Sequence, residues 1–207
     1  MVIKVKEIIL LGGAPAIGKS TVGGKLSKAI KIPCISTDDI RTGMRETESK
    51  IDSPALFYFE KSMIGEPADF LRKISLMSLI RAVDKESKEV WRGIEKTIFK
   101  KDNDKKSIII EGVAVLPKEA AAIMKCNNNI KAFILVNSNS KFIEDTINNR
   151  GLGGKPNLFP EELKQKQIKW VKKSNKIYKE RAQINGLDII DVNDHDHISK
   201  IIKLINS

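Results

Sequence analysis

The stretch Gly13-Ala14-Pro15-Ala16-Ile17-Gly18-Lys19-Ser20 decides the fold of this chain. It matches the pattern G-x-x-x-x-G-K-[ST] in full. The apolar run 8–11 before it predicts a short strand, and residues 21–30 after it predict a helix. A glycine-rich turn between a strand and a helix directs its backbone N–H groups at one small volume, which suits a chain of phosphates. The context therefore predicts a nucleotide-binding phosphate loop.

The side chains of this loop have separate expected roles. Lys19 is long enough to reach the β- and γ-phosphates, and the Ser20 hydroxyl is a ligand for Mg²⁺. We expect the nucleotide to be bound by Gly13, Ala14, Pro15, Ala16, Ile17, Gly18, Lys19, Ser20 and Thr21.

Composition limits the size and the partners of the protein. With 207 residues, 41% of them hydrophobic, the chain can form one α/β domain or a domain with a helical cap. The net charge of +11 comes mostly from lysines that alternate with Glu and Asp, and only 5% of the residues are aromatic. This pattern makes nucleic-acid binding possible but does not favour it over a small anionic substrate.

The location that we expect is the cytoplasm. No run approaches the roughly 18 apolar residues of a membrane span. Charged residues near the N-terminus lead directly into the first strand, which argues against a signal peptide. The two cysteines, Cys34 and Cys126, have no metal-binding or redox spacing, as is typical of thiols in a reducing compartment.

The hydrophobic pattern alternates between short apolar runs and longer helical stretches, which predicts an α/β fold with a parallel sheet and helices on both faces. Asp188 and Asp191 interrupt the last run, so we expect that strand at a sheet edge. The five expected strands are 8–11, 33–35, 107–110, 131–136 and 187–192.

The interval between the second and third expected strands is too long for one crossover helix. We predict a core of residues 1–48 and 107–207, with a helical insertion at 49–106 that covers the phosphate acceptor. Within the insertion, the pattern indicates a helix over 53–63, a second from Pro67 through residue 82, and another containing 90–98. A polar turn and one amphipathic helix are expected to close the chain.

The end of the second strand carries two carboxylates, Asp38 and Asp39. Ligands bind at the carboxyl ends of strands in such sheets. We expect Asp38 to orient or deprotonate an acceptor hydroxyl, or to hold Mg²⁺ through water. Helix capping is the alternative, with more weight for Asp39. Arg41 and Arg45 share one helix face and are expected to bind the anionic group of the acceptor, the alternative being solvated surface arginines.

The third strand ends in Glu111 and Gly112. An apolar strand that ends in an acidic residue is typical of the acidic strand that follows a phosphate loop. We expect Glu111 to orient Mg²⁺-bound water or contact the acceptor, and Gly112 to let a substrate approach the backbone. An ordinary strand end with a turn glycine is the alternative.

A glycine-rich segment follows Arg150 and precedes Lys155, which predicts a lid at 150–160. Either cation would cover the phosphates as charge develops, and we favour Arg150. A helix C-cap at the following glycine is a compatible interpretation. His195 and His197 are interpreted as part of a polar turn before the last helix and not as metal ligands.

The phosphate loop, the stretch Ile35–Arg41 with Met44 and Arg45, and Ile110–Val113 with Leu116 and Pro117 together resemble the archaeal 2-phosphoglycerate kinases. The resemblance implies a three-layer P-loop NTPase fold of the nucleoside-monophosphate-kinase type. It also implies ATP with Mg²⁺ as cofactors and an acceptor that is bound by the inserted helices. Ala114 stands where that family commonly has a histidine.

These observations predict an ATP- and Mg²⁺-dependent phosphotransferase that acts on a hydroxyl of a small anionic metabolite, with 2-phosphoglycerate as the expected acceptor. Lys19, Asp38 and Arg150 are the expected catalytic residues. Two alternatives stay open, a polynucleotide or nucleoside kinase and a nucleotide-dependent regulatory ATPase. A GTPase is disfavoured because no Asn-Lys-x-Asp stretch occurs. The sequence does not determine the oligomeric state.

Overall fold

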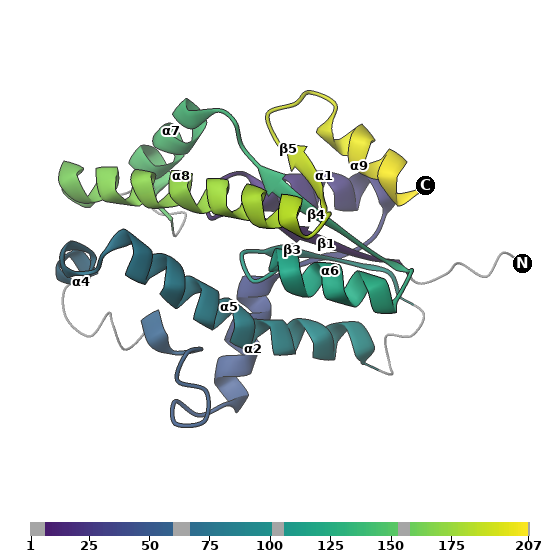
Figure 1. Cartoon of the computed structure of the whole chain (residues 1–207), viewed down its shortest axis with the longest axis horizontal. Coiled ribbons are helices and arrows are strands. Elements are labelled where there is room, and N and C mark those ends of the chain that lie inside the picture. The colour runs from purple at the N-terminus through teal and green to yellow at the C-terminus, as the bar shows by residue number, and fades with distance from the viewer. Residues whose placement is uncertain (1–6, 60–66, 101–105, 153–157, 207) are drawn as a thin grey trace, which may run out of the picture.

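The computed structural model describes residues 7–59, 67–100, 106–152 and 158–206 (Figure 1). Its five strands form one parallel sheet in the order β2-β3-β1-β4-β5, so the last strand lies at an edge as expected. The strands are β1 (Ile8–Gly12), β2 (Cys34–Ser36), β3 (Ile108–Gly112), β4 (Ile130–Val136) and β5 (Asp188–Asp191).

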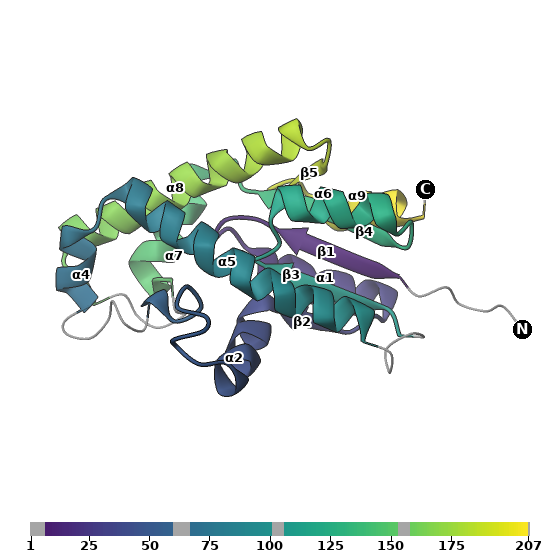
Figure 2. The same cartoon turned by 60° about the horizontal axis from the view of Figure 1, so that its bottom comes forward.

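Helices cover both faces of this sheet, which confirms the predicted fold class (Figures 1 and 2). One face carries α1 and α9, and the other carries α6 and α8, with α5 packed against α8 and α2. The helices are α1 (Lys19–Ile30), α2 (Thr37–Thr47), α4 (Pro67–Lys73), α5 (Leu76–Phe99), α6 (Pro117–Cys126), α7 (Ser140–Arg150), α8 (Glu161–Ile184) and α9 (His197–Ile205).

The central strand β1 is buried along its whole length. In the register of the sheet, Leu10 lies beside Ile110 of β3 and Ala132 of β4. Its apolar run is continuous because helices exclude water from both faces. The carboxyl ends of β1, β2, β3 and β4 meet at one edge, and this edge carries the site.

The insertion between β2 and β3 differs from the prediction at its start. Residues 54–57 form turns, helical structure begins only at residue 58, and residues 60–63 of the expected helix lie outside the described part. The Leu56 N–H bonds to the Ser53 carbonyl oxygen and the Tyr58 N–H to that of Ala55, which is the three-residue spacing of turns. Arg45 holds this turn by donating from Nε and Nη2 to the Leu56 carbonyl oxygen, at 2.9 and 2.7 Å.

The insertion also differs further along. Pro67 begins α4 as predicted, but α4 ends at Lys73, and a single helix, α5, then runs without a break to Phe99. The break occurs at Ser75, whose hydroxyl accepts the backbone N–H of Ser78 at 3.1 Å. Serine is a favoured N-cap residue, and here it starts a new helix where the periodic pattern had indicated a continuous one.

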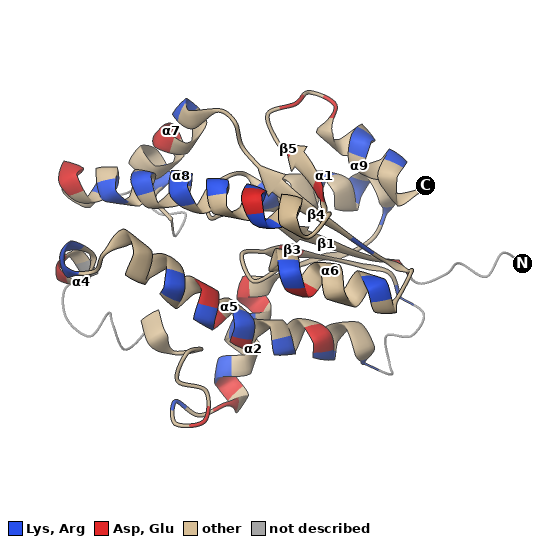
Figure 3. Cartoon of the chain, viewed as in Figure 1, with Lys and Arg blue, Asp and Glu red and all other residues tan. Residues whose placement is uncertain are grey.

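Charge is distributed unevenly over this fold. Figure 3 shows Lys and Arg along the length of α8, whereas basic and acidic residues alternate on α5 and α2. None of the helices in the described part of the chain is long and apolar enough to cross a membrane.

Candidate active site at the carboxyl end of the sheet

The phosphate loop connects β1 to α1 in a conformation that its sequence requires. At Gly13, where φ is +151°, an added Cβ would lie 2.5 Å from the carbonyl oxygen of Leu135, so the loop passes β4 too closely for any other residue. On the far side of the loop, the buried Asn137 donates from Nδ2 to the Ile17 carbonyl oxygen at 3.3 Å. Helix α1 begins at Lys19, so its unpaired N–H groups face the loop.

Lys19 is buried at 8% exposure, and its Nζ donates to the Ala14 carbonyl oxygen at 2.7 Å. Burial lowers the pKa of this lysine to about 8, and the nearby carboxylates of Glu111 and Asp38 partly oppose that shift. At neutral pH the lysine is therefore a cation that is largely removed from water. Phosphate oxygens would stabilise such a cation well.

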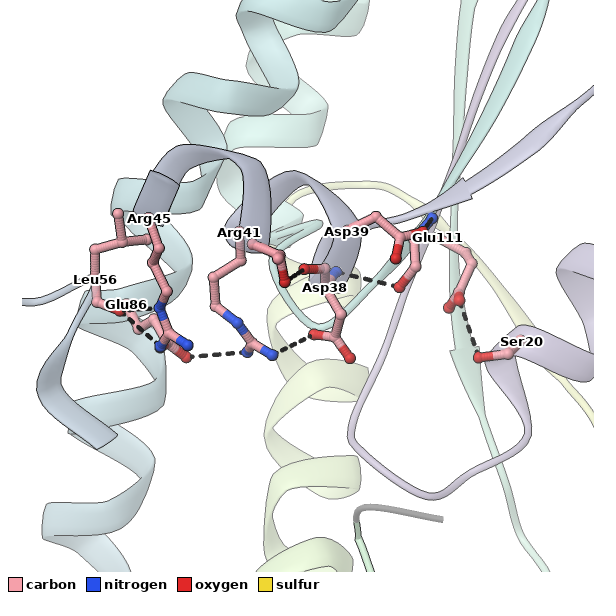
Figure 4. A network of polar contacts seen from close by, with 10 residues as sticks. Ser20, Asp38, Asp39, Arg41, Arg45, Leu56, Glu86 and Glu111 are labelled. Atoms are coloured by element: carbon pink, nitrogen blue, oxygen red, sulfur yellow. Dashed lines mark hydrogen bonds and ion pairs between the residues drawn. The ribbon is translucent and has the colours of Figure 1, made fainter. Parts of the chain in front are cut away.

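Ser20 and Glu111 bring the phosphate loop and the third strand together. The Ser20 hydroxyl donates to Glu111 Oε1 at 2.9 Å, and the Glu111 side chain is buried at the end of β3 (Figure 4). A hydroxyl and a carboxylate are hard oxygen donors of the kind that Mg²⁺ prefers. The pair thus places the two predicted metal-related residues in direct contact.

The two carboxylates after β2 have different surroundings. Ser36 and Asp39 form a capping box at the start of α2: the Ser36 hydroxyl accepts the Asp38 N–H at 3.1 Å, and Asp39 Oδ2 accepts the Ser36 N–H at 3.4 Å. Asp39 therefore caps the helix, the alternative that had more weight for it. The Asp38 side chain is 65% exposed and points away from the cap.

Gly112 is required for packing against α2. Its φ is +153°, and an added Cβ would lie 1.8 Å from Thr37 Oγ1. The position that a Cβ would take at residue 112 is thus filled by Thr37, which gives this glycine a packing role. Its expected contact with a substrate stays a prediction. The contact holds the first residue of α2, and with it Asp38, against the end of β3.

Arg41 and Arg45 converge on Glu86, a carboxylate of α5 that the sequence analysis did not select (Figure 4). Arg41 contacts Glu86 Oε2 through Nη1 at 3.4 Å and Asp38 Oδ1 through Nη2 at 3.1 Å. Arg45 contacts Glu86 Oε1 through Nη2 at 2.8 Å. These arginines are therefore not solvated surface residues, and Arg45 in addition holds the turn at Leu56.

Glu86 is 5% exposed, and burial raises the pKa of its carboxyl, whereas Arg41 and Arg45 act to lower it. A signal for Glu86 exists in the sequence. Glu86 occupies the same face of the helix as Leu79, Ala82 and Val90, which are buried apolar residues. A charged residue within an apolar stripe indicates a buried partner of opposite charge. Thr37 and Asn137 carry no comparable signal.

The predicted lid is described only in part. Arg150 is an exposed residue at the end of α7, and the N–H of Gly151 bonds to the Ile147 carbonyl oxygen, as the C-cap interpretation expected. Lys155 lies outside the described residues. No hydrogen bond or ion pair within the described ranges links Arg150 to the phosphate loop, so its role stays a prediction.

His195 lies in a polar turn that leads into the last helix, and His197 is the first residue of that helix. His197 Nδ1 is 2.5 Å from the Asp194 carbonyl oxygen, and α9 begins at His197. Within the part of the chain that the structure describes, no cluster of three or more histidine, cysteine and acidic side chains is placed to hold a metal ion.

The phosphate loop after β1, the carboxylate on β3 and the strand order define a P-loop NTPase fold. Solved structures of shikimate kinases have the same fold. The enzyme from Bacteroides thetaiotaomicron is 14% identical, with a TM-score of 0.55 and 97% of this chain and 99% of that chain covered. The enzyme from Acinetobacter baumannii, solved with shikimate, is 15% identical, with a TM-score of 0.51 and coverages of 99% and 94%.

Curated relatives named 2-phosphoglycerate kinase are similar to this chain. The protein from Methanocaldococcus jannaschii is 29% identical over 192 residues, which cover 89% of this chain and 58% of that protein. The protein from Methanococcus maripaludis (strain C7) is 26% identical over 210 residues, covering 96% of this chain and 64% of that protein. The chain thus spans less than two thirds of the length of these relatives. No family profile matches it.

Proposed function

We propose that this protein is an ATP- and Mg²⁺-dependent kinase that transfers a phosphoryl group to a hydroxyl of a small anionic metabolite, with 2-phosphoglycerate as acceptor and 2,3-bisphosphoglycerate as product. The observation that supports the proposal is the ion pair between Asp38 and Arg41, which lies near the contact between Ser20 and Glu111. The relatives named 2-phosphoglycerate kinase support the choice of acceptor.

The residues present fit a magnesium nucleotide. The close passage of Gly13 past β4 and the free N-terminus of α1 provide backbone donors for phosphates, and Lys19 adds a buried cation. Ser20 would hold Mg²⁺, with Glu111 bound to its hydroxyl as an outer partner. When bound, MgATP supplies the phosphoryl group and a leaving group whose charge the metal partly neutralises.

Asp38 is the base in this proposal. Its carboxylate takes the proton of the acceptor hydroxyl, and the electron pair of that O–H bond stays on the oxygen that attacks the γ-phosphorus. The bond from this phosphorus to the bridging oxygen breaks, and ADP leaves. Lys19 stabilises the negative charge that develops on the transferred group, a role that positioning and electrostatics alone can supply. We propose that Arg150 contributes further positive charge from the end of α7.

The acceptor would bind on the side of Asp38 that faces Arg41. A planar guanidinium matches a carboxylate or phosphate with two parallel hydrogen bonds, so Arg41 favours an anionic acceptor over a neutral alcohol. Arg45, whose Nε and Nη2 already bind Leu56 and Glu86, would act on the acceptor mainly by holding this arrangement.

The test is ATP-dependent phosphorylation of a panel that contains 2-phosphoglycerate, nucleoside monophosphates, sugars and 5′-hydroxyl oligonucleotides. We expect a bisphosphate product from 2-phosphoglycerate. Lys19→Ala should lower the rate by at least about 10²-fold, since it removes a cation at the transferred group. Lys25→Ala, at an exposed position on the same helix, is the matched control and should keep the wild-type rate.

Other outcomes of the panel would refute the acceptor or the reaction. Labelled oligonucleotide without labelled 2-phosphoglycerate would identify a polynucleotide kinase. Hydrolysis of ATP without any labelled acceptor would favour a regulatory ATPase. Activity that survives Lys19→Ala would exclude the phosphate loop from the reaction.

A further inference from the structure

Arg41 binds two carboxylates that differ greatly in exposure. The Glu86 side chain is 6% exposed, whereas the Asp38 side chain is 65% exposed. Ion pairs that water reaches are weak, but an ionised group that loses its partner inside a protein is strongly destabilised. An anion that arrives at Arg41 will therefore displace Asp38 and leave Glu86 in place.

The guanidinium of Arg41 also has an unused donor. Its Nε is buried and has no hydrogen-bond partner among the residues that the structure describes. In the planar guanidinium, the Nε–H lies on the same edge as Nη2, the nitrogen that Asp38 contacts. This edge is one of those that bind a carboxylate or phosphate with two hydrogen bonds. Asp38 meets Nη2 as an ion pair at 3.1 Å and leaves the Nε–H without a partner among the described residues.

Asp38 lies between this edge and the phosphate loop. Figure 4 shows its carboxylate between Arg41 and the contact of Ser20 with Glu111. Its negative charge also acts on the buried Lys19 ammonium. A carboxylate released from Arg41 is therefore already close to the position where an acceptor hydroxyl must meet the phosphates.

We propose that the anionic group of the acceptor and the Asp38 carboxylate compete for Nη2 of Arg41, so that acceptor binding releases Asp38 to accept the hydroxyl proton. The inference rests on the proposed function, because it assumes an anionic acceptor. Glu86 holds Arg41 through Nη1 and serves as the fixed positioning residue. In this arrangement the base is freed only when the acceptor is in place.

The competition predicts an unusual effect of Asp38→Asn. A neutral amide competes weakly for a guanidinium, so the variant should bind 2-phosphoglycerate more tightly by about two- to fivefold, the strength of an exposed ion pair. At the same time its turnover should fall strongly, because the base is lost. Binding is measured by calorimetry with saturating MgADP, which occupies the phosphate loop.

Asp39→Asn is the matched control for charge. It removes the same negative charge one residue along, and an asparagine can still accept the hydrogen bond from the Ser36 N–H. We expect it to change the affinity for 2-phosphoglycerate far less than Asp38→Asn does. Equal tightening in both variants would assign the effect to net charge and overturn the inference. Unchanged or weaker binding by Asp38→Asn would overturn it as well.

Arg41→Gln separates this inference from the choice of acceptor. In its presence, Asp38→Asn should no longer increase affinity. If the wild-type protein does not bind 2-phosphoglycerate, the same titrations are made with inorganic phosphate, again with saturating MgADP. If Asp38→Asn then binds phosphate more tightly than the wild type does, and Arg41→Gln abolishes this gain, the competition is retained and only 2-phosphoglycerate is refuted as acceptor. If neither anion shows binding that depends on Arg41, the competition is refuted.

Discussion

Lys19→Met should stabilise the free protein while it abolishes phosphoryl transfer. Burial lowers the pKa of Lys19 from 10.5 to about 8. Each pKa unit corresponds to about 1.4 kcal/mol, so the folded protein loses about 3 kcal/mol by holding this lysine as a cation at pH 7. Loss of the hydrogen bond to the Ala14 carbonyl oxygen offsets about 1 kcal/mol of that. We therefore expect the free energy of unfolding to rise by about 2 kcal/mol.

The pH dependence of this difference has a definite sign. Between pH 8 and 10.5, the unfolded chain keeps the proton on Lys19 more firmly than the folded protein does. The destabilisation caused by the buried Lys19 cation is therefore fully present below about pH 8. It decreases as the pH rises through this window, because the folded protein has then released the proton. Methionine does not titrate. The advantage of Lys19→Met should thus be largest at neutral pH and disappear as the pH approaches 10.5.

Urea denaturation at pH 7 and at about pH 10, without nucleotide, measures both effects. Lys25→Met, at an exposed position on the same helix, is the control and should leave the free energy of unfolding nearly unchanged at both pH values. A Lys19→Met protein that is less stable than wild type at pH 7 would refute the reasoning. So would an advantage of equal size at both pH values.

Two further predictions concern packing and thiol reactivity. Gly93→Ala should destabilise the protein by about 1 kcal/mol, because the added Cβ would lie 2.6 Å from side-chain atoms of α2. Gly43→Ala should stabilise it by up to about 1 kcal/mol, because a Cβ there meets nothing within 4 Å and alanine favours a helix. Urea denaturation compares the free energies of unfolding of the two variants. A thiol reagent at pH 8 should modify the exposed Cys126 rapidly and Cys34 slowly, because burial and Glu111 raise the pKa of Cys34 to about 11. The variant Cys126→Ser gives the rate of Cys34 alone. Equal rates for the two thiols would contradict this account.

The features that the sequence predicts well are local. The phosphate loop, the apolar strands and the polar edge strand follow from patterns within a few residues, and the structure has all of them. Glu111 was expected near the metal or the acceptor because it ends a strand; its hydrogen bond with Ser20 is compatible with that role, which stays a prediction. Local patterns succeed here because strand burial and helix starts depend mainly on neighbouring residues.

The features that were missed depend on contacts between distant parts of the chain. Glu86 meets Arg41 and Arg45 only after α5 has packed against α2, across more than forty positions of sequence. Thr37 fills the space beside Gly112 for the same reason. Whether a glycine faces a ligand or another side chain is decided by tertiary packing, about which the residue type alone carries no information.

The tight contact of helix α5 with α2, at Gly93, lies nearer to its C-terminal end than to its N-terminal end. With 24 residues the helix is about 36 Å long, and at Gly93 it packs so tightly against α2 that an added Cβ would lie 2.6 Å from Ile40 and Met44. Glu86 is only about 10 Å along the axis from that point, whereas the beginning of the helix at Leu76 is about 25 Å away. A tilt of about 5° around Gly93 would move Leu76 by about 2 Å but Glu86 by less than about 1 Å. Such a tilt would therefore displace the outer end of the insertion more than the carboxylate that contacts both arginines.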